Sequence, residues 1–163
     1  MTIQKKLKTM NKEELILVIN DLLKYNSENR KYLNLRLSDE IDFKKLSEES
    51  KIKIKNCFSD FKADIRRSKK ILSDYNKLNP PIDLYLDLFL FYLEYGIKYG
   101  QHRDMYSSFY YSFEIMFEKF LDLIKNDSIL VSKYKSKLEK IVDNSQPGYG
   151  HYDTLSELME VIK

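Results

Sequence analysis

The sequence predicts an all-α protein, and three observations lead to this prediction. Glycine and proline are scarce, with 4 Gly and 3 Pro among 163 residues, whereas a sheet of many short strands needs both residues at its turns. Apolar side chains recur at steps of three and four residues, which is the spacing of one face of an α-helix. Side chains that can cap a helix precede several of these apolar runs. We therefore expect one domain over residues 1–163, a single compact bundle of six to eight helices.

The composition is that of an ordinary folded domain. Hydrophobic residues make up 43% of the chain and charged residues 33%, which distinguishes it from a disordered protein. Cys57 is the only cysteine, so no disulfide can form within the chain, as is usual in a reducing compartment. The first ten residues are polar and rich in lysine, unlike a signal peptide. We therefore expect a cytoplasmic protein, whose net charge of +3 neither requires nor excludes an anionic partner.

Two short helices are expected near the N-terminus, after a helical lead-in over residues 2–8. Asn11 can cap the first of them, and Glu14 stands three residues later, where its side chain can reach back to the cap. Ser27 can cap the second helix, which follows after a short connection. We expect the two helices to form an antiparallel hairpin, followed at 38–45 by a connector or a single helical turn.

A regular apolar seam predicts one long helix in the next part of the chain. Ser47 can cap it, and the acidic residues that follow Ser47 favour the positive end of a helix. The seam alternates steps of four and three residues through Ile54, Phe58, Phe61, Ile65, Ser68, Leu72 and Tyr75. We expect this helix to be continuous, straight or kinked near Ser59. It should end before Asn79-Pro80-Pro81, because proline disfavours helix in the residue before it.

The helix expected near 82–99 is apolar on nearly every face, so it should occupy the centre of the bundle. The apolar stretch within it is short and contains Asp83 and Asp87, which makes it unsuitable as a bilayer span. No membrane partner is therefore expected. Gly100 can end this helix.

Three further helices complete the predicted bundle. Asp104 is the expected cap of a helix with a wide aromatic face over 106–124, and Ser128 is the expected cap of the next helix. The segment 144–150 is rich in glycine and proline, which indicates a loop. Residues 154–157 have the pattern of a capping box for a short terminal helix.

Glu94 is the first candidate for a functional side chain, because it interrupts the apolar helix near 82–99. We expect its carboxylate to be partly desolvated and to require a cation or hydrogen-bond donors. Arg66 and Arg67, on the preceding helix, are the expected ion-pair partners. The alternative is that Glu94 acts as a general acid or base.

Each of the two histidines begins a His-x-Asp sequence in a loop before a predicted helix. The four residues are His102, Asp104, His151 and Asp153. If the two loops meet, two imidazoles and two carboxylates could ligate a divalent metal ion. The alternative is that the aspartates cap helices and that the histidines add polarity to the surface.

The region 44–77 contains more Lys and Arg than Asp and Glu. Lys62, Arg66, Lys69 and Lys70 are expected along one side of the long helix, away from its apolar seam. A cationic helix face can lie against a phosphate backbone, so these residues are candidates for nucleic-acid binding. The alternative is a solvated face, because acidic residues are interspersed.

Three segments carry a likeness that spans nearly the whole chain. They are Leu7-x-x-Met10-x-x-Glu13-Glu14-Leu15; Leu93-Glu94-Tyr95-Gly96 followed by Asp104, Phe109-Tyr110-x-Ser112 and Met116-Phe117-Glu118; and Gly148-Tyr149-Gly150 followed by an Asp and a short helix. In this order they resemble an uncharacterised bacterial family, domain of unknown function sixty-one fifty-five. The resemblance implies an all-helical, single-domain bacterial protein and implies no activity. It also marks a candidate functional cluster made of Glu94, Asp104, Tyr110, Ser112 and Glu118.

No motif in the sequence is specific for a reaction: phosphate-binding glycine loops, nucleophile elbows, zinc-type clusters and calcium loops are absent. The chain is instead rich in residue types that protein interfaces favour, with 13 Tyr, 9 Phe and 5 Met. We therefore expect a non-enzymatic helical module, without a cofactor, that binds an unknown protein partner or a second copy of itself. The alternatives are nucleic-acid binding through 44–77, and an enzyme or metal protein that uses Glu94, Glu118 and the His-x-Asp loops.

Overall fold

In a computed structural model of this chain, most of the described residues are in α-helices. The described residues are 2–37, 41–59, 62–101 and 103–162. Within these ranges there are nine α-helices, two short 3-10 helices and one two-stranded β-hairpin. The all-α prediction is confirmed, but the expected number of six to eight helices is too low, because the predicted long helix after Ser47 is two helices.

By its internal packing the chain divides into two units, Met1–Ile41 and Asp42–Lys163, and each is described by itself. That residues 1–163 form one domain stays a prediction. The first unit contains three helices, which are α1 (Ile3–Thr9), α2 (Lys12–Tyr25) and α3 (Ser27–Arg36).

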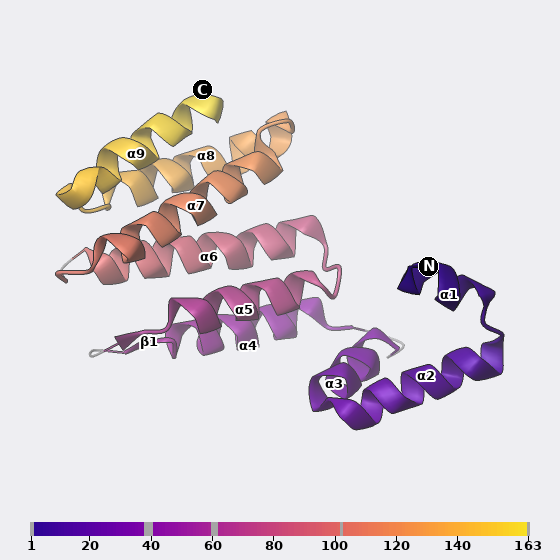
Figure 1. The fold of residues 1–163 in the computed structure, drawn as a ribbon. Helices are drawn as coiled ribbons and strands as arrows, with labels where there is room; N and C mark the ends of the chain where they lie inside the picture. The colour runs from indigo at the N-terminus through magenta and orange to yellow at the C-terminus, as the bar shows by residue number, and fades with distance from the viewer. Residues whose placement is uncertain (1, 38–40, 60–61, 102, 163) are drawn as a thin grey trace. The chain divides into compact units, whose positions relative to one another are not determined.

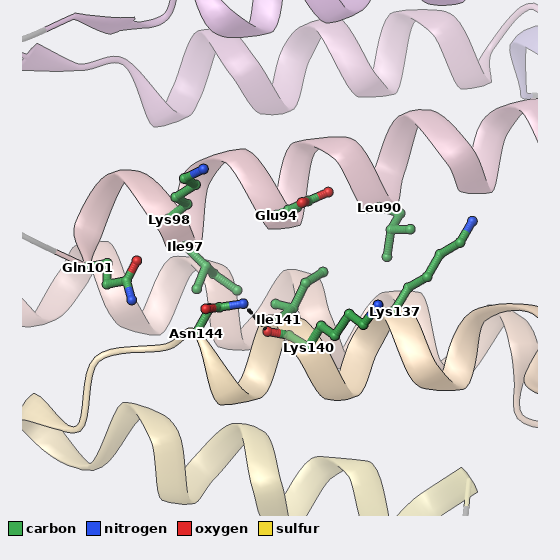
Figure 2. A pocket seen from close by; sticks show the side chains of 9 residues that line it. All are labelled: Leu90, Glu94, Ile97, Lys98, Gln101, Lys137, Lys140, Ile141 and Asn144. Carbon is green, nitrogen blue, oxygen red and sulfur yellow. Dashed lines mark hydrogen bonds between the residues drawn. The ribbon is translucent and has the colours of Figure 1, made fainter.

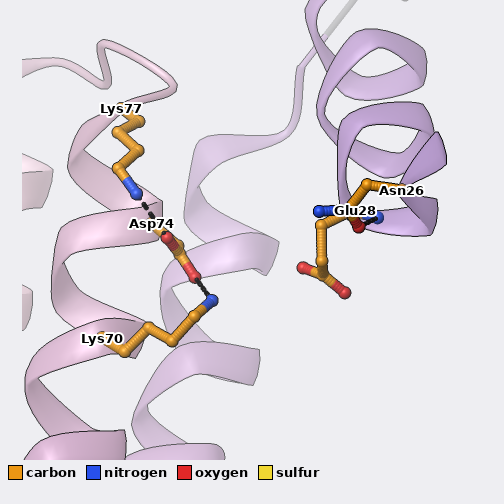
Figure 3. Close-up of polar contacts among 5 residues, drawn as sticks. All are labelled: Asn26, Glu28, Lys70, Asp74 and Lys77. Atoms are coloured by element: carbon orange, nitrogen blue, oxygen red, sulfur yellow. Dashed lines mark hydrogen bonds and ion pairs between the residues drawn. The ribbon is translucent and has the colours of Figure 1, made fainter. Parts of the chain in front are cut away.

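Side-chain caps define the helices of the first unit. At the start of α2, the backbone N–H of Glu14 donates to Asn11 Oδ1 and the N–H of Asn11 donates to Glu14 Oε2, both at 2.9 Å. This is the predicted capping box. The cap of α3 is Asn26 and not Ser27, because the extended backbone at Asn26 directs its side chain to the N–H of Glu28, at 2.9 Å (Figure 3).

The second unit is built around α6, as predicted for the segment near 82–99. In Figure 1, α6 lies between the pair α4–α5 on one side and α7, α8 and α9 on the other. Its buried side chains point in several directions, because helices cover it from both sides. The helices of this unit are α4 (Phe43–Lys55), α5 (Ile65–Asn76), α6 (Ile82–Gly100), α7 (Ser107–Ile124), α8 (Ser128–Asp143) and α9 (His151–Leu158), with 3-10 helices η1 (Gly148–Gly150) and η2 (Met159–Ile162).

The prediction of one long helix after Ser47 is wrong, because the chain forms two helices there. Between α4 and α5, strands β1 (Phe58–Ser59) and β2 (Lys62–Ala63) pair antiparallel. The second helix has its own cap, because Asp64 Oδ1 accepts the N–H of Arg67 at 3.0 Å. The apolar seam is preserved across the break, and its described buried members are Ile54, Phe58, Ser68, Leu72 and Tyr75.

Several other predicted caps are also wrong. Asp42 caps α4, accepting the N–H of Lys45 at 2.9 Å, so Ser47 lies inside the helix and is buried. Helix α7 follows Tyr106, which makes no side-chain cap, so Asp104 does not cap it. In α8 the cap is Asp127, one residue before the predicted Ser128. Each observed aspartate cap lies one residue outside its helix, where its oxygen reaches a free backbone N–H.

Two tyrosine hydroxyls in the core have opposite hydrogen-bond status. The hydroxyl of Tyr134 donates to Asp87 Oδ1 at 2.9 Å. The hydroxyl of Tyr92 is, among the described residues, the one buried side-chain oxygen or nitrogen without a hydrogen-bond partner. Burial raises the pKa of Tyr92 and the neighbouring Ser68 hydroxyl counteracts this rise, but the two hydroxyls do not form a hydrogen bond. Tyr92 therefore carries an uncompensated desolvation cost.

Removal of the Tyr92 hydroxyl is expected to stabilise the protein. Tyr92→Phe should raise the free energy of unfolding by about 1 kcal/mol, because the unsatisfied group disappears. Tyr134→Phe should lower it by about 1 kcal/mol, because Asp87 loses its donor. Urea denaturation of both variants measures the difference. Equal losses in the two variants would mean that Tyr92 has a hydrogen-bond partner in solution.

Candidate functional site

A pocket of about 210 Å³ lies between α6 and α8, at the position of Glu94 (Figure 2). Side chains of Leu90 and Ile97 from α6 and Ile141 from α8 provide its apolar part. Its polar part is cationic, with three lysines against one carboxylate, and the polar lining residues are Glu94, Lys98, Gln101, Lys137, Lys140 and Asn144. The lining positions on each helix recur at steps of three or four residues, with one adjacent pair on each (Ile97–Lys98 and Lys140–Ile141), so each helix contributes one face.

Glu94 does not have the environment that the sequence predicts. Its side chain is exposed, whereas partial desolvation was expected from its apolar neighbours in the sequence. The reason is that the pocket is open to solvent there and the facing helix α8 contributes Lys137 and Lys140 beside its one apolar residue, Ile141. Arg66 and Arg67 make no described ion pair with Glu94, and Arg66 lines a different cavity.

That second cavity is a groove of about 500 Å³ between α5 and the N-terminal half of α7. Two cations, Arg66 and Lys69, line it together with the hydroxyl-bearing residues Tyr106, Ser108 and Ser112. The remaining lining residues are apolar, namely Ala63, Ile65, Met105 and Phe109. Among the described lining residues there is no carboxylate. The lining of the groove therefore has a net positive charge.

Lys69 is the cation of this lining whose surroundings disfavour a positive charge most clearly. Burial lowers the pKa of Lys69, and the nearby charge of Lys119 lowers it further. No described carboxylate forms an ion pair with either lysine. The charged form of Lys69 is thus disfavoured by burial and by a neighbouring positive charge, and an anion beside it would favour that form.

Lys70, on the same helix, is in a different situation. Its Nζ lies 2.6 Å from Asp74 Oδ2, and the Nζ of Lys77 lies 2.8 Å from Asp74 Oδ1 (Figure 3). Burial tends to raise the pKa of Asp74, but the two lysine hydrogen bonds outweigh it and lower the pKa. Lys62 is exposed on β2. The predicted basic face is therefore mixed in sign, and its concentrated part is at Arg66 and Lys69.

His151 is buried, with 2% of its surface exposed, so the expectation of a surface histidine is wrong. Its Nδ1 lies 2.8 Å from Glu114 Oε1 of α7, and its ring is 5.1 Å from that of Tyr110. The left-handed backbone at Tyr149 and Gly150 (φ of 57° and 69°) turns the chain into α9. Helix α9 begins at His151, three residues before the predicted capping box.

Tyr110 is tied to the loop before α9 and to the loop before α7. Its hydroxyl donates to Gln146 Oε1 at 2.8 Å, and Arg103 O lies 3.3 Å away. Burial raises the pKa of Tyr110, a backbone hydrogen bond at Met105 lowers it, and the charge of Asp104 raises it again. Tyr110, Glu114 and His151 thus fasten α9 to α7, which is a structural role for side chains of catalytic type.

The predicted metal site is not supported by the described residues. His102 lies outside them, His151 is paired with Glu114, and Asp153 is exposed on the first turn of α9. Nowhere in the described ranges does a group of three or more His, Cys, Asp or Glu side chains come close enough to hold a metal ion. Asp104 remains exposed beside Tyr110.

The five residues of the candidate cluster do not meet in one cavity, although the structure describes all of them. Glu94 lines the pocket between α6 and α8, and Ser112 lines the groove between α5 and α7. Tyr110 is buried toward α9, whereas Asp104 and Glu118 are exposed. The residue of α7 that meets a histidine is Glu114, one helical turn before Glu118.

The first unit presents an apolar helix face that its own helices do not bury. No side chain described between residues 2 and 37 is buried. Ile16, Ile19 and Leu22 of α2 are exposed by 46%, 42% and 51%, on the face that also contains Leu15 and Leu23. Such a face is typical of a helix that packs against another element.

No known protein family, curated protein or solved structure matches this chain. Its similarity to the family of unknown function stays a prediction. Among the described residues, none of the helices combines the length and the apolar character needed to cross a membrane.

Proposed function

We propose that this chain is a helical protein-interaction module and that α2 is its interaction helix. The observation that supports the proposal is the exposed apolar face of α2 at Ile16, Ile19 and Leu22. A unit of about 40 residues cannot bury enough apolar surface to be stable without further support. Because no described side chain of α1–α3 is buried, this unit needs contact with another surface.

The partner that we propose is a second copy of the chain. A twofold axis brings the same face of α2 together from both copies, so one apolar face meets another. With the two α2 helices antiparallel, Ile19 near the centre of one face meets Ile19 of the other copy, and Ile16 of each helix lies near Leu22 of the other. The apolar contact can then extend over the length of α2, about 21 Å.

The solution mass of the full chain and of two variants tests this proposal. Ile19→Glu places a charge in the centre of the apolar face, and we expect it to shift a dimer to a monomer across a concentration series in analytical ultracentrifugation. Leu17→Glu is the matched control, because Leu17 is 64% exposed on the opposite side of α2. It should leave the dimer intact.

Two outcomes would overturn the proposal. One is a monomeric chain at all concentrations whose α2 amides are protected from hydrogen exchange, since the chain itself would then cover the face. The other is an equal loss of dimer in Ile19→Glu and Leu17→Glu, which would place the contact elsewhere.

A further inference from the structure

We infer that the groove between α5 and α7 binds a phosphate monoester attached to an apolar or aromatic group. The inference concerns the second unit and is independent of self-association through α2. It begins from Arg66 and Lys69, which line the groove without any carboxylate among the described lining residues. A cavity with two cations and no counter-charge favours an anionic ligand.

The donors in the groove match the oxygens of a phosphate group. A phosphate monoester has a charge of about −1.5 to −2 and three acceptor oxygens. The guanidinium of Arg66 can donate two parallel hydrogen bonds, and the ammonium of Lys69 adds a second charge. Ser108 and Ser112 lie four residues apart on α7 and bring two hydroxyl donors to the same side.

The state of Lys69 supports an anionic occupant. Burial and the neighbouring Lys119 both lower the pKa of Lys69, which means that its charged form is disfavoured by the protein's own groups. A dianion beside Lys69 reverses this effect. The pKa of Lys69 should therefore rise when the ligand binds, and binding should take up protons at a pH where Lys69 is partly neutral.

The size and the apolar wall of the groove indicate the rest of the ligand. Its volume of about 500 Å³ lies in the range of small-molecule sites, about 300–1,000 Å³, and exceeds the needs of phosphate alone. Ile65, Met105 and Phe109 form an apolar surface next to the cations, and the exposed ring of Tyr106 stands at the edge. An apolar or flat aromatic group joined to the phosphate fits this surface.

Isothermal titration calorimetry of the full chain, in buffer free of phosphate and sulfate, tests the inference. The probes are inorganic phosphate, a nucleoside 5′-monophosphate and the same nucleoside without phosphate. We expect the monophosphate to bind at least about tenfold more tightly than inorganic phosphate. The nucleoside alone should show no binding.

Arg66→Gln and Lys69→Gln should each lower the affinity for the monophosphate by about tenfold or more, which is the effect expected when one charge-assisted hydrogen bond is lost. Arg67→Gln is the matched control, because Arg67 is exposed on the same helix and does not line the groove. It should change affinity less than about twofold, which is the size expected for a distant screened charge.

A 5′-phosphorylated RNA oligonucleotide and its 5′-hydroxyl counterpart distinguish the two sources of a phosphate monoester. If the phosphorylated oligonucleotide binds more tightly than both its 5′-hydroxyl counterpart and the free nucleoside monophosphate, the site is assigned to a nucleic-acid terminus. Equal binding of both oligonucleotides would overturn the inference, because the groove would then recognise phosphodiesters. It would also be overturned by no binding of any probe at millimolar concentration, by equal losses in Arg66→Gln and Arg67→Gln, or by a nucleoside that binds as well as its monophosphate.

Discussion

Gly96→Ala is expected to lower the free energy of unfolding by about 2 kcal/mol, although alanine is the better helix former. A Cβ atom at position 96 of α6 would overlap the ring of Phe113 on α7. That ring has no exposed surface and packs against Tyr92 at 5.2 Å and Phe109 at 5.0 Å between ring centroids. Because the neighbours are themselves buried, α6 and α7 must separate or the ring must leave its place. This cost exceeds the gain of about 1 kcal/mol in helix propensity.

Two controls test the reason for this loss. Gly148→Ala makes the same substitution where the nearest side-chain atom is Gln146 Nε2 at 3.8 Å, so its effect should be small. In a Phe113→Leu background, Gly96→Ala should cost less than in the wild type, with a coupling energy of at least about 1 kcal/mol in a double-mutant cycle. Urea denaturation of the four proteins gives this energy. Strict additivity of the two substitutions would show that α6 and α7 do not meet at this position.

The sequence predicts the centre of the fold better than its boundaries. The segment near 82–99 is apolar on nearly every face, and only a helix that is covered from both sides can use such a pattern, as α6 does. The break between α4 and α5, in contrast, does not interrupt the apolar seam that runs from Ile54 to Tyr75. Ile54, Phe58 and Leu72 face the core on either side of the hairpin, so the pattern is the same for one helix or two. Asp64 is the signal that was available, since an aspartate at that place can begin a new helix.

The candidate site was less predictable, because its contacts join residues that are far apart in the sequence. Nothing local relates Glu114 to His151, which lies 37 positions later, or α6 to the lysines of α8. Arg66 and Lys69 were singled out by the predicted basic helix face, and Ser112 by the family resemblance. Their common groove depends on how α5 and α7 pack against α6, which periodicity alone does not specify.

The free energy of unfolding is also expected to fall steeply as the pH rises above about 10, the ordinary pKa of tyrosine. Burial raises the pKa of five tyrosines in the folded protein, and these are Tyr75, Tyr85, Tyr92, Tyr110 and Tyr134. Above this pH the unfolded chain releases these protons while the folded chain keeps them. Each such group then favours unfolding by about 1.4 kcal/mol for every further pH unit, until the pH reaches the pKa that the group has in the folded protein. Lys69, whose pKa is lowered, acts in the opposite direction, but it is a single group.

Tyr134→Phe is the variant that isolates this effect. Tyr134 has no exposed surface, and burial together with the hydrogen bond to Asp87 raises its pKa, so it remains protonated in the folded state. Near neutral pH the variant should be less stable than the wild type by about 1 kcal/mol. Between about pH 10 and 11 this difference should vanish and then reverse, because phenylalanine has no proton to lose on unfolding. Tyr106→Phe, at a position that is 86% exposed, should leave stability unchanged throughout. Urea denaturation at a series of pH values measures these differences, and tyrosinate absorbance reports which rings have ionised. If all tyrosines ionise near pH 10 while the helical circular dichroism persists, the core admits water and the prediction fails.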